Sequence, residues 1–226
     1  MKNWIQNLKV SAKLFLIAML AVFVTLLLGI LSFALMWQME SISTTMSEQW
    51  MRGVDDSRAA ETYFVDYRLN ERTYLTSTSE SSRQTGLEEM NSLSGKIDDV
   101  LSTYQNTLDA NDAEEVSLLQ AVEDDWSTYQ EIHEKMFAAA DAGNTESAIQ
   151  MLEGEGMTAY SSLKNALADL AQFNSNGATE AAERSTNIFH NATLALALVV
   201  VGTIIIGLAL TLFIARCILS PVKEIE

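Results

Sequence analysis

The sequence predicts an all-α, membrane-anchored protein, in which an up-down-up-down four-helix bundle is joined to two transmembrane helices. Three observations predict this fold class. Two stretches of 24 residues, 14–37 and 192–215, contain no charged residue. The 154 residues between them, 38–191, contain no proline and only seven glycines. Within this middle segment, apolar residues recur at steps of three and four, which is the spacing of one helix face.

Each uncharged stretch is long enough to cross a membrane, because a helix spans the bilayer core with about 20 residues. The chain ends carry basic residues, namely Lys2, Lys9, Lys13, Arg216 and Lys223. Short flanks rich in Lys and Arg stay in the cytoplasm. We therefore expect a cytoplasmic N-terminus at 1–13, transmembrane helices at 14–37 and 192–215, and a periplasmic sensor domain at 38–191. A cleaved signal peptide is the alternative for the first stretch, but such apolar regions usually run about 7–15 residues.

The segment 38–191 is strongly acidic. It contains 28 of the 30 acidic residues and 9 of the 14 basic residues, so its formal charge is −19. Nucleic-acid binding needs a basic surface, so no nucleic-acid partner is expected. The charge is explained by a solvated surface that keeps the domain soluble. The single cysteine, Cys217, lies outside this segment, so packing rather than a disulfide must stabilise it.

The first two helices of the bundle are predicted from their apolar stripes. The first is expected to continue the transmembrane stretch without a break and to end at the Ser/Thr-rich run 76–82. Its stripe comprises Met39, Ile42, Met46, Gly53, Ala60, Tyr63, Tyr67 and Tyr74. The second helix has the stripe Leu87, Met90, Ile97, Leu101, Tyr104 and Leu108. Stripes of this spacing pack helices nearly parallel in a bundle.

Local capping signals bound the last two helices. Asn111 is expected to cap the third helix, with Glu114 completing a capping box. The stripe of this helix is Leu119, Val122, Trp126, Tyr129, His133, Met136 and Ala140. Gly143 suits the left-handed residue that ends a helix, and Asn144 is expected to cap the fourth. The fourth stripe is Met151, Tyr160, Leu163, Leu167 and Leu170, with a short break or bulge expected at the Glu-Gly-Glu-Gly segment 153–156.

Arg68 and Arg72 are the candidate ligand-binding residues of the first bundle helix, with Tyr67 beside them. Residues four apart share one helix face, and two guanidinium groups there can hold a carboxylate through charge-assisted hydrogen bonds. The alternative is that Arg68 pairs internally with Asp66 or Glu71. The fourth helix offers hydroxyl groups that could complete an anion site, on Thr158, Tyr160 and Ser161.

Signals of catalysis or of cofactor binding are missing from the sequence. We find no nucleophile and base at matching positions, no glycine-rich phosphate loop and no metal-ligand spacing. His133 lies in an apolar stripe without a second His or Cys nearby, so we expect a core or rim residue rather than a metal ligand. We predict no enzyme activity, no metal and no cofactor.

The whole chain resembles the N-terminal half of bacterial methyl-accepting chemotaxis proteins that have a four-helix-bundle sensor domain. The resemblance rests on a Lys-flanked first span, the bundle, the second span and the tail 216–226, which looks like the opening of a HAMP linker with its proline, Pro221. The segment 142–148 also looks typical of the turn before the fourth helix. The Arg-x-x-x-Arg spacing of the family's aspartate and serine receptors is matched by Arg68 and Arg72, whereas a further family arginine falls near Tyr63.

The resemblance implies a homodimer in the bacterial inner membrane that binds a small organic acid or amino acid between subunits. It further implies that the fourth helix and second span shift slightly on binding. Regions absent from this chain would then control a cytoplasmic histidine kinase together with an adaptor. Two alternatives remain open. One is the sensor half of a membrane histidine kinase or diguanylate cyclase, and the other is a bundle that contacts a periplasmic protein instead of a small molecule.

Overall fold

The computed structural model describes residues 10–219 of the chain. The predictions that concern Lys2, Lys9, Pro221 and Lys223 therefore lie outside the described residues. The chain divides into two compact units, of which unit 1 falls within Met1–Ser43 and Glu183–Glu226 and unit 2 is Thr44–Ala182. Within residues 10–219, helices make up nearly all of both units and no strand occurs. The predicted all-α class is confirmed.

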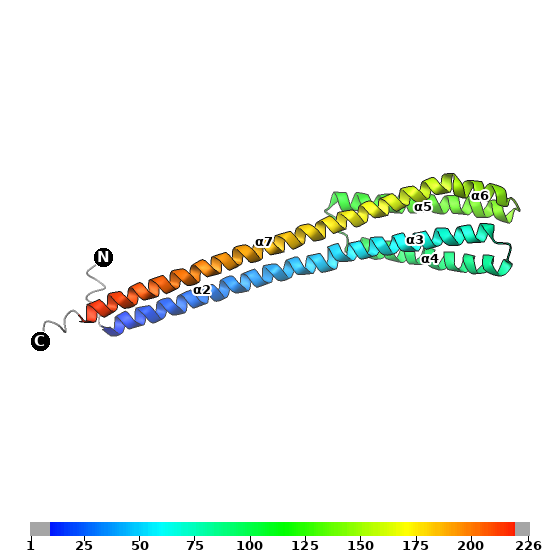
Figure 1. Cartoon of the computed structure of the whole chain (residues 1–226). Helices are drawn as coiled ribbons and strands as arrows, with labels where there is room; N and C mark the ends of the chain where they lie inside the picture. Colours follow the sequence, from blue (N-terminus) through cyan, green and yellow to red (C-terminus); the bar gives the residue numbers. More distant parts are fainter. Residues whose placement is uncertain (1–9, 220–226) are drawn as a thin grey trace. The chain divides into compact units, whose positions relative to one another are not determined.

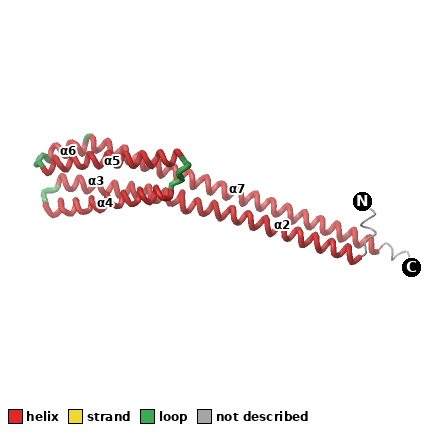
Figure 2. Tube along the Cα trace, turned by 180° about the vertical axis from the view of Figure 1, so that it is seen from behind, coloured by secondary structure: helices red, strands yellow, loops and turns green. Residues whose placement is uncertain are grey.

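Unit 2 is the four-helix bundle. Three of its helices are α3 (Arg52–Thr76), α4 (Glu80–Thr107) and α5 (Ala113–Asp141). The fourth consists of α6 (Thr145–Glu153) and the first part of α7 (Glu155–Leu219). The four helices lie side by side and reverse direction from one to the next, whereas α7 continues in the direction of α6 (Figures 1 and 2). This is the predicted up-down-up-down order, and the predicted break at 153–156 is the junction between α6 and α7.

The helix boundaries of unit 2 follow local capping chemistry. Gly143 has a φ of 82°, in the left-handed region that glycine adopts without steric cost. The side chain of Asn144 accepts a hydrogen bond from the Ser147 N–H, as predicted for a cap. One cap was predicted wrongly. Asp112, rather than Asn111, accepts from the N–H groups that begin α5.

The displacement of this cap by one residue has a local cause. Asn111 is held in the preceding turn, where both its main-chain N–H and its Nδ2 donate to Oδ1 of Asp109. Its side chain is therefore engaged outside the helix. Asp112 is left as the residue that enters α5 with an extended backbone, which is the conformation of an N-cap.

The core of the bundle is built from buried aromatic and aliphatic side chains on all four helices. Most predicted stripe positions are buried, but the stripes omit seven buried core residues. These are Phe64, Leu75, Leu93, Ile132, Ala148, Leu152 and Ala159. Phe64 is fully buried, and its ring contacts Trp126, Tyr129 and Tyr160. Tyr63 is only partly buried. The bundle face is thus wider than a strict seam of two positions per heptad.

The helix that precedes α3 contains an irregular turn. Residues Met46–Met51 form a π-helix, η1, between α2 (Val10–Thr45) and α3. A π-helical turn bonds each residue to the fifth one along and so inserts an extra residue into the α-helical phase. The expectation of an unbroken first helix holds for the backbone as a whole. It fails for the hydrogen-bond register, which changes at η1.

Unit 1 consists of α2 and the last part of α7, which lie side by side in both views (Figures 1 and 2). Large apolar side chains on both are exposed, such as Trp37 at 71% and Leu198 at 73%. By length and composition, the helical runs Ala18–Thr76 and Thr145–Leu212 each contain a window apolar enough to cross a membrane. Neither window is buried within the structure.

Candidate ligand-binding site

The site lies in unit 2, where α3 passes the junction of α6 and α7. The junction residue Gly154 has φ −96° and ψ −101°, which no helix residue adopts. A helix end leaves main-chain oxygens without partners along its own axis. At this junction the main-chain oxygen of Leu152, in the last turn of α6, accepts a hydrogen bond from a side chain of another helix.

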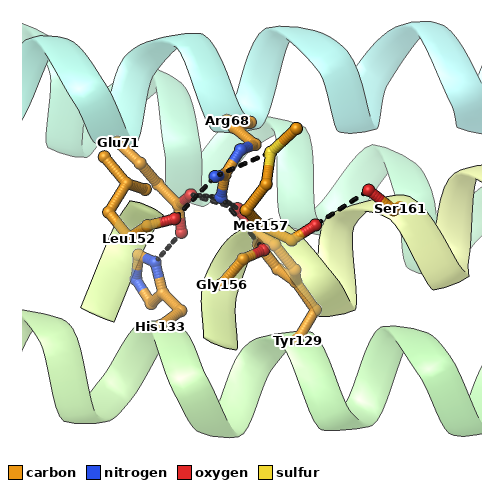
Figure 3. Close-up of polar contacts among 8 residues, drawn as sticks. All are labelled: Arg68, Glu71, Tyr129, His133, Leu152, Gly156, Met157 and Ser161. Atoms are coloured by element: carbon orange, nitrogen blue, oxygen red, sulfur yellow. Dashed lines mark hydrogen bonds and ion pairs between the residues drawn. The ribbon is translucent and has the colours of Figure 1, made fainter. Parts of the chain in front are cut away.

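That side chain is Arg68 of α3 (Figure 3). Its Nη2 donates to the main-chain oxygen of Leu152 at 2.8 Å. Its Nη1 donates to the main-chain oxygen of Gly156 at 3.3 Å and to the hydroxyl of Tyr129 at 2.9 Å. The guanidinium carbon also lies 5.0 Å from the ring centre of Tyr160, a cation–π contact. Arg68 therefore joins α3, α5 and both sides of the helix junction.

Glu71 lies behind Arg68 and carries a fully buried carboxylate. It accepts a hydrogen bond from the Tyr129 hydroxyl, and its Oε1 lies 2.6 Å from Nδ1 of His133. Its Oε2 is 3.9 Å from Nη1 of Arg68. Burial, and then the charge of Glu71, raise the pKa of the Tyr129 phenol well above its usual value. Tyr129 consequently stays protonated and available as a donor to Glu71.

A surface pocket of about 460 Å³ opens in front of this buried group. Its walls come from α3, α6 and α7, and are formed by Val65, Arg68, Leu69, Arg72, Leu152, Glu153, Met157 and Tyr160. Leu69 and Met157 are exposed at 62% and 48%. The Arg72 side chain is exposed and makes no hydrogen bond or ion pair with the residues that the structure describes. The pocket thus combines apolar side chains with the exposed guanidinium of Arg72 and the exposed carboxylate of Glu153.

The structure brings together three of the six predicted site residues. Arg68, Arg72 and Tyr160 all line the pocket. Tyr67 does not, because it points into the core, where it is 4% exposed and its ring contacts Trp126 and His133.

Thr158 and Ser161 also lie apart from the pocket. Their hydroxyls donate to main-chain oxygens one turn earlier in α7, of Gly154 and Met157 respectively, and both residues are exposed. Hydroxyl groups in helices commonly bond back to their own helix in this way. Of the three predicted hydroxyl-bearing residues, only Tyr160 therefore lines the pocket.

Sequence reasoning missed Tyr129, Leu152 and Met157 as residues of the site. The alternative that Arg68 pairs internally with Glu71 is confirmed, although the pairing adds to contacts with three other oxygens. His133 is a rim residue, with 17% of its side chain exposed. In the described part of the chain, no group of three or more His, Cys, Asp or Glu side chains could hold a metal ion.

Comparison with known proteins places this geometry in context. The model of a family described as "Four helix bundle sensory module for signal transduction" matches residues 7–189. The chain is 21% identical over 220 residues to a protein of Bacillus subtilis (strain 168) named "Putative sensory transducer protein YvaQ". That alignment covers 97% of this chain and 38% of the relative. The chain therefore spans well under half of the relative's length.

Proposed function

The chain belongs to the family of four-helix-bundle sensory modules for signal transduction, and we propose that it is the sensor part of a transmembrane chemoreceptor that detects a small anionic molecule. The observation that carries this proposal is the open guanidinium of Arg72 in a surface pocket that also has apolar walls. A sensory module needs a site that recognises a signal rather than one that transforms a substrate. We accordingly expect no catalytic activity.

Arg72 is the proposed contact for the anion. A guanidinium group binds a carboxylate through two parallel charge-assisted hydrogen bonds, which give both affinity and orientation. Arg68 has already committed both terminal nitrogens to oxygens of Tyr129, Leu152 and Gly156. It supports the site by holding its wall in place, whereas Arg72 has its donors available.

The pocket suits a ligand of a few carbon atoms. Its volume of about 460 Å³ lies in the range of about 300–1,000 Å³ for small-molecule sites. Val65, Leu69 and Met157 would contact an apolar part of the ligand. Glu153 at the same pocket would favour an amino group through its opposite charge. A small organic acid and an amino acid are therefore the two ligand classes proposed.

The route of the signal is proposed to be α7. This helix supplies Met157 and Tyr160 to the pocket and also contains the apolar stretch 192–215. A hydrogen-bonded helix barely compresses, and small helix shifts are an established means of switching. We propose that the stretches 14–37 and 192–215 cross the bacterial inner membrane with the bundle in the periplasm. A HAMP linker beginning at 216–226 would then lead to a module that controls a histidine kinase and its adaptor.

A second copy of the chain is the proposed partner of the bundle. The pocket rim exposes Val65, Leu69 and Met157, which are apolar side chains on neighbouring turns of α3 and α7. Exposed apolar groups clustered in this way mark interaction surfaces. A symmetric dimer through this face would cover them and would bring two equivalent sites to one interface. The same architecture would serve the sensor half of a membrane histidine kinase or diguanylate cyclase, so the output module is the main alternative.

The test is a thermal-shift assay on the whole chain in detergent micelles, with succinate, malate, aspartate and serine as probes. A ligand that binds only the folded state raises the melting temperature by mass action. We expect at least one probe to raise it, Arg72→Ala to abolish that shift, and Arg72→Lys to weaken it. Arg58→Ala, which removes another exposed arginine of α3, should leave the shift intact. If no probe acts, or if Arg72→Ala responds like the unchanged chain, the proposed site is wrong.

A further inference from the structure

At two glycines of unit 2, a side chain of the opposite helix occupies the space that a Cβ atom would take. A Cβ atom on Gly177 of α7 would lie 2.4 Å from Cε3 of Trp50, which belongs to η1. A Cβ atom on Gly53 of α3 would lie 2.0 Å from Oδ1 of Asn174, which belongs to α7. Carbon atoms do not approach other heavy atoms this closely. Each glycine therefore leaves a space that a larger side chain of the facing helix occupies.

The two contacts form a reciprocal pair. From Trp50 to Gly53 the first helix advances by three residues, and from Gly177 to Asn174 the antiparallel α7 retreats by three. In the first pair the large residue, Trp50, is on η1 and the glycine is on α7. In the second pair the glycine, Gly53, is on α3 and the larger residue, Asn174, is on α7. Phe173 adds an edge-on contact to the Trp50 ring, with ring centres 5.8 Å apart.

This arrangement opposes sliding of α7 along α3. A slip of one helical turn is about 5.4 Å and would place a residue four positions from Gly177 opposite the indole. Those residues are Phe173 and Ala181, and both carry the Cβ atom for which there is no room at Gly177. Asn174 would leave Gly53 in the same step. The Trp50 indole and the Asn174 amide can therefore both be accommodated at only one axial position of α7 relative to α3.

Asn174 adds a polar requirement to the steric one. It is fully buried, and its Nδ2 donates to the Tyr104 hydroxyl at 2.7 Å and to the Leu170 main-chain oxygen at 2.8 Å. Tyr104 in turn donates to Oε1 of Glu115 at 3.0 Å, so α7 is tied to α4 and α5. Oδ1 of Asn174 accepts no hydrogen bond from the described residues. A buried asparagine at a helix interface specifies register at a cost in stability.

We propose that Trp50, Gly53, Asn174 and Gly177 form a register lock that holds α7 at one axial position against α3. The lock defines the resting position of the helix that runs on into the second apolar stretch. It depends on packing and on one buried amide, and it operates whichever ligand the pocket takes. Its test is therefore independent of the proposed function.

The packing part is tested by melting temperatures of the whole chain in detergent. Overpacking predicts that Gly53→Ala and Gly177→Ala each lower the melting temperature by about 3–10 °C. The matched control is Gly95→Ala on α4, where an added Cβ meets nothing within 4 Å, and it should not lower it. If Gly177→Ala behaves like Gly95→Ala, the lock does not exist.

A double variant covers the case in which Gly177→Ala fails to fold. In the Trp50→Ala background the hole at residue 177 has lost its occupant, so adding Gly177→Ala should cause no further loss. Equal losses in both backgrounds would mean that the two residues act independently, and the proposal would fail.

The register part is tested by a distance along the helices. Spin labels at the exposed positions Thr73 of α3 and Gln172 of α7, in a Cys217→Ser background, should report one narrow distance. Asn174→Leu removes the buried amide, both its two hydrogen bonds and its Oδ1, which has no partner among the described residues. We expect it to keep the melting temperature but to broaden or shift this distance by up to about one turn, 5.4 Å. A single, unchanged distance in Asn174→Leu would overturn the role of Asn174 in setting the register.

Discussion

The guanidinium of Arg68 lies at the junction of α6 and α7, with its Nη2 2.8 Å from the main-chain oxygen of Leu152 (Figure 3). A long side chain of α3 thereby satisfies an oxygen that the broken fourth helix cannot satisfy itself. The two arginines of the Arg-x-x-x-Arg spacing consequently differ. Arg68 is bonded to the wall of the pocket, whereas the guanidinium of Arg72 lines the pocket without a hydrogen bond to the described residues.

The first prediction concerns Arg68→Ala. The change removes donors to Leu152, Gly156 and Tyr129 and leaves the buried carboxylate of Glu71 without its nearby cation. Losing one partner of such a group destabilises a fold strongly, so we expect a loss of about 2–4 kcal/mol in the free energy of unfolding. Urea unfolding followed by circular dichroism measures it. Arg72→Ala is the control and should change stability by no more than about 0.5 kcal/mol.

Local signals made much of this fold predictable. The cap Asn144, the left-handed Gly143 and the break at 153–156 each depend on residues within one helical turn of one another, and all three are as predicted. The helical stripes also identified most of the core. The bundle architecture therefore follows from short-range chemistry and apolar spacing.

The site was less predictable because its contacts are distant in sequence. The acceptors of Arg68 on Tyr129 and Leu152 are 61 and 84 residues away. Spacing within α3 correctly put Arg68 and Arg72 on one face, but it could not reveal that one of them closes a junction in another helix. Tyr67 illustrates the same limit. Adjacent residues of a helix lie on different faces, so its side chain points into the core whereas that of Arg68 does not.

Phe64 provides a second prediction. Its ring is fully buried and contacts the rings of Trp126, Tyr129 and Tyr160. Removing a buried phenylalanine loses both transfer free energy and packing, so Phe64→Ala should cost about 3–5 kcal/mol. Tyr63→Ala is the neighbouring control and should cost clearly less, because Tyr63 is only partly buried and lies under the ammonium group of Lys96. Equal costs in urea unfolding would contradict the wider core face described above.

A third prediction compares two glycines with opposite backbone requirements. Gly143 has a φ of 82°, where a Cβ atom is strained, so Gly143→Ala should lower the free energy of unfolding by about 1 kcal/mol. Gly95 lies within α4, and a Cβ atom there meets nothing within 4 Å. Alanine favours a helix over glycine by about 0.8–1.0 kcal/mol, so Gly95→Ala should raise stability. Thermal unfolding of the two variants should therefore shift in opposite directions.

The last prediction concerns the pH dependence that Glu115 gives to stability. The side chain is 2% exposed, and burial raises the pKa of its carboxyl above the usual value of 4.5. Between pH 4.5 and the higher pKa of the folded state, the folded protein binds more protons than the unfolded chain. Stability must therefore fall as pH rises through this interval. Glu115→Gln cannot titrate, so this contribution to the slope should vanish in the variant.

The measurement is urea unfolding of both proteins at several values between pH 4 and pH 8. The stability of Glu115→Gln relative to the unchanged chain should rise from about pH 4.5 upward and then level off. In Glu115→Gln one carboxylate oxygen, an acceptor, is replaced by an NH₂ donor next to the Tyr104 hydroxyl and the Asp109 N–H. This lowers the free energy of unfolding by an amount that does not depend on pH and adds to the slope. Glu114→Gln alters the exposed neighbour on α5 and supplies the baseline. A flat difference for Glu115→Gln would show that its carboxyl titrates alike in the folded and unfolded chain.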